Sequence, residues 1–99
     1  MSYKIIVTSE SEKTFNQNLE YLSKEWNDNV TIQFIDRVDE VIQTIRENPL
    51  LFSLHNYETN VRKAIINKRI ILYYRIIDDL VIELLSFWNT SRDPKDLKF

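Results

Sequence analysis

The stretch VRKAIINKRIILYYRIIDDLVIELLSFWNTSRDPKDLK, residues 61–98, decides the fold of this 99-residue chain. Valine, isoleucine, tyrosine and phenylalanine dominate its apolar runs, and such residues are typical of strands in a half-buried sheet. Asn67-Lys68 and Asp78-Asp79 interrupt these runs with turn-forming residues. The pattern therefore predicts three antiparallel strands joined by two tight turns, followed by a polar tail with the sequence NTSRDPKDL.

The composition indicates one globular domain over residues 1–99, with a hydrophobic content of 43%. Cysteine is absent, which excludes disulfides and thiolate chemistry, and the absence of glycine excludes a glycine-rich phosphate loop. No apolar run approaches the roughly 20 residues of a membrane helix, and the N-terminus lacks a signal-peptide pattern. We therefore expect a cytoplasmic protein without membrane contact and without a cofactor.

Charge is unevenly spread along the chain, although the formal net charge is only −2. Residues 1–60 carry five basic and ten acidic side chains, whereas residues 61–99 carry eight basic and five acidic ones. The second half is therefore the electropositive side, where an acidic partner or a phosphate backbone would bind. The acidic side chains of the first half have spacings typical of solvated helix faces, so no metal site is predicted.

Upstream of this stretch, the pattern predicts a short strand over residues 3–8 and two amphipathic helices. The first helix is expected to start at a capping box formed by Ser9 and Glu12 and to end near residues 27–29. The second runs from about Val30 to Glu47 and stops before Pro49. Each helix has one apolar stripe: Phe15, Leu19, Leu22 and Trp26 in the first, and Phe34, Val38, Val41 and Ile45 in the second. The short linker predicts an antiparallel helical hairpin, and residues 50–60 are expected to form a loop.

Together these elements predict an α+β fold, with the helical hairpin packed on one face of a four-stranded, mainly antiparallel sheet. The sequence leaves open which strand pairs with the N-terminal one. A two-residue turn at Asn67-Lys68 sets Arg62 opposite Tyr73, and an odd-length turn at Asp78-Asp79 sets Glu83 opposite Arg75. The face turned away from the helices is then predicted to carry Arg62, Arg69, Ile71, Tyr73, Arg75, Glu83, Leu85 and Phe87. Such an uncovered face indicates an interaction site.

Other candidate residues receive less weight. His55, the only histidine, is expected to be a surface residue in a loop, because a lone imidazole is seldom catalytic. Trp26 and Trp88 are expected in the core or at its edge. Arg92, followed by Asp93-Pro94, lies either at the rim of the site or in a turn that caps the last strand.

The order of these elements resembles the RelE/ParE superfamily of toxins from bacterial toxin–antitoxin pairs. The resemblance rests on ENPLLF (47–52), ILYYRIIDDLVIEL (71–84) and SFWNTSRDP (86–94), the last being similar to ParE-like members. It implies a toxin that arrests growth and is neutralised by a cognate antitoxin, as a homodimer or as a heterotetramer with that antitoxin. The open face is where the antitoxin would bind, with Ile71, Leu85 and Phe87 as apolar anchors.

The resemblance leaves two mechanisms open. ParE-like members are described as poisons of DNA gyrase, whereas RelE-like members are endoribonucleases that cut messenger RNA on the ribosome. In the nuclease, the cations would be Arg62, Arg69, Arg75 and Arg92, but Ile71 and Thr90 stand where the resemblance expects arginines. No tyrosine or histidine occurs between Asn89 and Phe99 to act as acid or base, which favours the gyrase mechanism or a decayed nuclease. A non-toxic protein-interaction module on the same scaffold is a third hypothesis.

Overall fold

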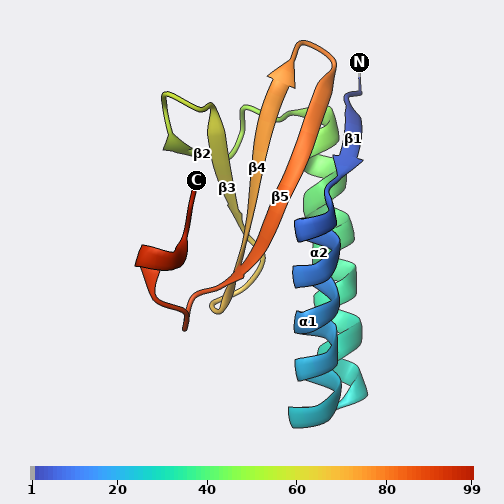
Figure 1. Cartoon of the computed structure of the whole chain (residues 1–99). Helices are drawn as coiled ribbons and strands as arrows, with labels where there is room; N and C mark the ends of the chain where they lie inside the picture. Colours follow the sequence, from blue (N-terminus) through green and yellow to red (C-terminus); the bar gives the residue numbers. More distant parts are fainter. Residues whose placement is uncertain (1) are drawn as a thin grey trace.

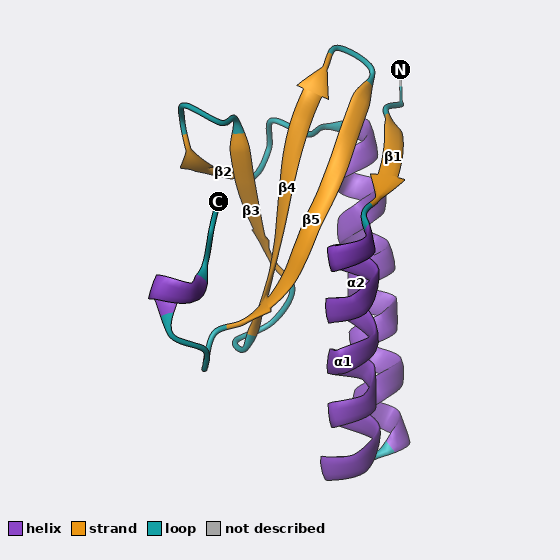
Figure 2. Cartoon of the chain, in the orientation of Figure 1, coloured by secondary structure: helices purple, strands orange, loops and turns teal. Residues whose placement is uncertain are grey.

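The computed structural model describes residues 2–99 and contains one five-stranded sheet with two helices on one of its faces (Figures 1 and 2). The strand order is β1-β5-β4-β3-β2, in which β1 pairs with β5 in parallel and all other pairs are antiparallel. The elements are β1 (Lys4–Val7), α1 (Ser9–Glu25), α2 (Asp28–Glu47), β2 (Ser53–Asn56), β3 (Val61–Ile65), β4 (Ile70–Asp78), β5 (Val81–Asn89) and the 3-10 helix η1 (Pro94–Asp96). Among residues 2–99, no helix has the length and apolar character needed to cross a bilayer.

The α+β prediction is confirmed, but the sheet has one strand more than expected. Strand β2 lies in the segment that was predicted to be a loop. It is only four residues long and irregularly paired, with a register shift between Leu54 and Asn56. Its sequence, SLHN, lacks the alternation of apolar and polar residues that marks a half-buried strand, so the pattern gave no signal for it.

The helical hairpin is confirmed, and both helix starts differ from the prediction by one or two residues. The side chain of Thr8, not that of Ser9, caps α1 by accepting a hydrogen bond from the Ser11 N–H. Asn27 caps α2 in the same way by accepting from the Val30 N–H. The expected stripe of α2 is buried throughout and packs on the sheet: Phe34, Val38, Val41 and Ile45.

Helix α1 runs along the edge of β5, and its buried residues are mostly polar: Ser11, Thr14, Asn18 and Leu22. Strand β1 pairs with β5 only as far as Leu84, which leaves the next backbone groups of β5 without a strand partner on that side. Thr14 Oγ1 accepts from the Phe87 N–H at 2.9 Å, and Asn18 Nδ2 donates to the Phe87 carbonyl at 3.1 Å. The helix thus completes the hydrogen bonding of the strand edge. Trp26, expected on the apolar stripe, is 51% exposed at the end of α1.

The register between β4 and β5 is as predicted at Arg75 and Glu83, and it then shifts by one residue. Arg75 lies opposite Glu83, and their side chains form an ion pair at 2.6 Å. Between Tyr73–Tyr74 and the facing Leu84–Ser86 the pairing is irregular, because Leu85 has no residue opposite it. This bulge exchanges the faces of the residues that follow. Phe87 lies on the helix side, not on the open face, and Trp88 lies on the open face, not in the main core.

The hairpin between β3 and β4 differs from the prediction in the same manner. Its turn includes Arg69, because the Ile66 N–H donates to the Ile70 carbonyl and the Asn67 side chain accepts from the N–H groups of Arg69 and Ile70. Arg62 is therefore opposite Tyr74 rather than Tyr73, and Lys63 takes the position opposite Tyr73. The placement of Arg62 on the open face was wrong.

Arg62 holds the segment that follows α2. Its Nη1 donates to the Phe52 carbonyl at 2.6 Å. The hydroxyl of Tyr74, which lies opposite Arg62 and is fully buried, donates to the Pro49 carbonyl at 2.6 Å. Burial raises the pKa of Tyr74 far above its ordinary value, although the charge of Arg62 opposes this shift. These two bonds attach the helix-to-sheet connection to the core.

Candidate functional site

The open face, defined as the side of the sheet away from α1 and α2, carries a second and smaller apolar cluster. Buried Val61, Tyr73 and Trp88 form its centre, with partly buried Ile71 and Leu85 beside them. The C-terminal segment packs on this cluster through Leu97 and Phe99. The prediction that no part of the chain covers this face was therefore wrong, because the C-terminal segment covers part of it. Figure 1 shows the end of the chain beside the strands, on the side away from the helices.

An aromatic cluster of Tyr73, His55 and Phe99 lies on this face. The His55 ring meets Tyr73 edge-on with centroids 4.8 Å apart, and Phe99 lies 5.7 Å from Tyr73. Tyr73 is only 5% exposed, and burial raises the pKa of its phenol, which therefore stays protonated. Tyr73 is thus a floor for the site rather than the exposed contact that was expected.

His55 is held in one orientation by the main chain. Its Nε2 lies 3.0 Å from the main-chain oxygen of Phe99. Because this main-chain oxygen, as a carbonyl or a carboxylate oxygen, only accepts, Nε2 carries the hydrogen, and in the neutral ring the lone pair is then on Nδ1. The ring is partly buried. His55 had been expected to be an ordinary surface residue, because its strand was not recognised and nothing in the sequence linked it to Tyr73.

The predicted cations lie in four different places rather than together on the open face. Arg75 lies on this face, with its side chain 43% exposed and paired with Glu83. Arg92 lies at the rim, where its guanidinium stacks over Trp88 at 4.2 Å. Arg69 stacks over Trp26 at 5.7 Å, at the end of the helical hairpin. Arg62 lies on the helix side, and the open-face position next to it belongs to the partly buried Lys63.

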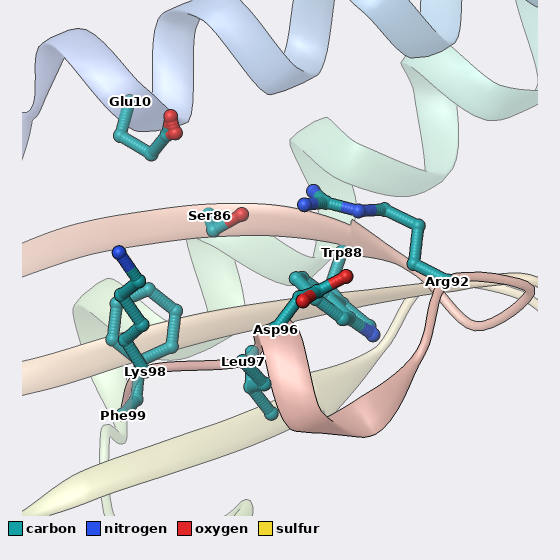
Figure 3. Close-up of a pocket in the computed structure, with 8 residues that line it drawn as sticks. All are labelled: Glu10, Ser86, Trp88, Arg92, Asp96, Leu97, Lys98 and Phe99. Atoms are coloured by element: carbon teal, nitrogen blue, oxygen red, sulfur yellow. The ribbon is translucent and has the colours of Figure 1, made fainter.

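A cavity of about 280 Å³ lies between the start of α1, β5 and the C-terminal segment (Figure 3). Ser86 and Trp88 form its floor on β5, and the other lining residues are Glu10, Arg92, Asp96, Leu97, Lys98 and Phe99. Two cations and two carboxylates line it, so the cavity is polar without a strong excess of either sign. Among residues 2–99, no three His, Asp or Glu side chains are grouped to hold a metal ion.

The open face therefore brings together a histidine, a lysine and an ion-paired arginine around a buried tyrosine. Of the expected apolar anchors, Ile71 and Leu85 lie on this face and Phe87 does not. Sequence reasoning missed His55, Lys63, Ser86, Trp88 and Phe99. Lys63 and Trp88 could have been placed on the open face only by recognising the extra residue in the β3–β4 turn and the bulge in β5. Neither feature has a distinct sequence signal when glycine is absent.

Comparison with known proteins identifies the family. The family model described as "ParE toxin of type II toxin-antitoxin system, parDE" matches residues 5–94. A search among curated proteins returned no significant match.

Three solved structures have a similar fold. The YoeB dimer from Staphylococcus aureus has 19% identity and a TM-score of 0.60, covering 89% of this chain and 97% of that one. YafQ in the Escherichia coli DinJ-YafQ toxin-antitoxin complex has 13% identity and a TM-score of 0.62, covering 92% and 96%. A copper-bound mutant toxin from Helicobacter pylori has 23% identity and a TM-score of 0.61, covering 92% and 97%. At these identities the structures show the fold alone. Because the family model spans most of its length, the chain belongs to the family of ParE toxins of type II toxin–antitoxin systems, within the RelE/ParE superfamily.

Proposed function

We propose that this toxin arrests growth by cutting RNA, with His55 as the acid or base and the open face as the active site. One observation carries the proposal: the single imidazole of the chain lies on the open face, against Tyr73 and on the same side of the sheet as Lys63 and Arg75. The sequence argument against a nuclease was that the tail lacks an acid or base. His55, on β2, supplies that group from a different element.

The chemistry requires a proton acceptor and positive charge around one phosphate. In the proposed reaction the ribose 2′-hydroxyl attacks the adjacent phosphorus and a 2′,3′-cyclic phosphate forms. The bond from phosphorus to the 5′-oxygen breaks, and this oxygen takes a proton from solvent water and leaves as a 5′-hydroxyl. His55 Nδ1, left with its lone pair by the Nε2 contact, accepts the 2′-hydroxyl proton. The ammonium of Lys63 and the guanidinium of Arg75 offset the charge that develops on the phosphate oxygens.

We propose a cognate antitoxin as the partner that keeps the toxin inactive. The family is one of two-component systems, and the E. coli relative was solved as a toxin-antitoxin complex. A segment of the antitoxin that lies over the open face, with apolar side chains against Ile71 and Leu85, would cover His55 and Lys63. Such a complex is also compatible with a heterotetramer, and the free toxin with a homodimer.

Gyrase poisoning stays a prediction of the family resemblance. It requires only a binding surface and no catalytic group, so it gives no role to a histidine fixed by a main-chain contact. A ribosome-dependent reaction, in contrast, uses that group and places the messenger strand on the basic face.

The test is induced expression in a host that lacks the antitoxin, scored for growth and for cuts in transcripts by primer extension. We compare the wild type with His55→Phe, which keeps an aromatic ring beside Tyr73 but cannot transfer a proton. Tyr57→Phe is the control, because Tyr57 is 86% exposed nearby. The wild type and the control should arrest growth and produce cuts, and His55→Phe should lose both by about 10²–10⁴-fold in rate.

Three results would overturn the proposal. The first is growth arrest without transcript cuts but with loss of supercoiling by purified gyrase, which would establish the gyrase mechanism. The second is undiminished cutting by His55→Phe, which would remove His55 from the chemistry. Unchanged growth on induction of the wild type would favour the non-toxic interaction module.

A further inference from the structure

A groove runs round the end of β5, on the side of the molecule next to α1. It consists of two adjoining cavities of about 210 and 400 Å³, which share Tyr21 on α1 and Asn89 and Ser91 at the end of β5. The smaller cavity also reaches Arg92, which lines the open-face cavity of Figure 3, and the larger one reaches Arg69. We call this continuous surface the end groove. It joins the rim of the candidate active site to the β3–β4 turn.

Each end of the groove carries a guanidinium that stacks on an indole. Arg92 lies over Trp88 at 4.2 Å and Arg69 over Trp26 at 5.7 Å. Within residues 2–99, neither guanidinium forms an ion pair or donates a hydrogen bond, so stacking orients both groups while their N–H edges stay available. Two oriented guanidinium groups along one groove suit the phosphates of a nucleic-acid chain.

The remaining groups of the groove suit bases rather than a peptide. Tyr21 lines both cavities and is 44% exposed. Trp26 lies under Arg69, outside the cavity lining, and is 51% exposed, so both rings offer surface for stacking. Gln17, Asn89 and Ser91 add amide and hydroxyl groups, and no carboxylate lines either cavity. Glu20 shares an outer hollow with Tyr21 and is paired there with Lys24 at 2.7 Å, while Glu10 and Asp96 line the adjoining open-face cavity beyond Arg92. Glu25 lines the same outer hollow.

We propose that the end groove binds single-stranded RNA and guides the strand from Arg69 to the open face. Aromatic faces interleaved with cations are the usual means of holding unpaired nucleotides, and stacking tolerates any base. The inference rests on the proposed function for its choice of RNA. An acidic segment of the antitoxin is the competing occupant, and the experiment separates the two.

The experiment measures binding of purified toxin to a fluorescent six-nucleotide RNA by anisotropy, with 2′-O-methyl groups throughout so that it cannot be cut. Arg69→Glu reverses the charge in the groove, and Tyr21→Ala removes a stacking ring. Lys4→Glu makes the same charge change on β1, outside the groove. Each groove variant should weaken binding by about tenfold, and Lys4→Glu by less than about twofold. Arg69→Glu should also reduce the salt dependence of binding by about one phosphate contact.

Equal affinities of Arg69→Glu and Lys4→Glu would overturn the inference, as would the absence of RNA binding by the wild type. Normal RNA binding by the groove variants with loss of antitoxin binding would assign the groove to the antitoxin instead. Failure of the proposed function looks different: His55→Phe would then cut transcripts like the wild type, while the groove variants still bind RNA weakly. Circular dichroism of each variant checks that it is folded.

Discussion

The hydrogen bonds between α1 and β5 lead to a sharp prediction for Thr14→Val. Thr14 and Phe87 are each 4% exposed, and the Thr14 hydroxyl is the acceptor for the Phe87 N–H at 2.9 Å. Valine keeps the shape of threonine and a similar helix propensity, so the change removes mainly the acceptor. The Phe87 N–H is then buried without a partner, which costs about 1–3 kcal/mol.

Urea unfolding followed by circular dichroism measures this loss as a change in the free energy of unfolding. For a domain of this size it corresponds to a fall in Tm of about 5–20 °C. Thr14→Ser, which keeps the hydroxyl, should lose less than about 1 kcal/mol.

Thr44 on α2 provides a matched control. Its hydroxyl donates to the Glu40 carbonyl at 3.0 Å, four residues earlier, as that of Thr14 does to the Glu10 carbonyl at 2.8 Å. Within residues 2–99, however, the Thr44 hydroxyl makes no hydrogen bond to a strand. Thr44→Val should therefore change stability by no more than about 0.5 kcal/mol. Equal losses in Thr14→Val and Thr44→Val would refute the claim that the helix side chain completes the strand edge.

Three further predictions concern other parts of the core and the site. Leu72→Ala should lower the free energy of unfolding in urea titrations by about 2–5 kcal/mol, because Leu72 is fully buried. Arg75→Ala should lower it by less than about 1 kcal/mol, because the ion pair of Arg75 with Glu83 is partly exposed. Comparable losses in the two variants would contradict the assignment of faces. Arg62→Ala should lower the melting temperature, because the Phe52 carbonyl loses its hydrogen-bond donor. At a temperature where the variant is folded, it should cut transcripts like the wild type. A folded variant that does not cut would show that Arg62 takes part in the reaction. Burial raises the pKa of Tyr73 and Tyr74 above the ordinary value of 10.0. The stability that these protonated phenols contribute is therefore present below pH 10 and is lost as the pH rises above it. The free energy of unfolding, measured between pH 8 and 11, should fall less steeply in Tyr74→Phe than in the wild type.

Patterns that repeat along an element predicted the structure well. The helical hairpin was predicted from the apolar stripe of α2, the end of this helix before Pro49 and the short linker. Burial of one helix face requires apolar residues at intervals of three or four, which is the spacing of the stripe. The opposed charges of Arg75 and Glu83 correctly predicted their pairing, but the predicted odd-length turn was wrong: Asp78 pairs with Val81, and the register shifts at Ile77. The parallel pairing of β1 with β5 was left open, since a strand of four residues carries no mark of its partner.

The errors arose where one residue changes the face of all that follow. The β3–β4 turn exchanged Arg62 with Lys63, and the bulge at Leu85 exchanged Phe87 with Trp88. Side chains in a strand alternate with a period of two, so an error of one position reverses every later assignment. Sequence alone also could not show that the polar residues Thr14 and Asn18 are buried, because their partners are backbone groups of a distant strand.

The unpaired Leu85 has a consequence for transferring residue roles between relatives. Upstream of it, odd-numbered positions of β5 point away from the helices, and from Ser86 onward even-numbered ones do. A relative that lacks this insertion would present its equivalent of Phe87 to a ligand and bury its equivalent of Trp88, with no change in amino-acid type. Columns of a sequence alignment near the end of this strand therefore do not correspond to positions in space unless the bulge is shared.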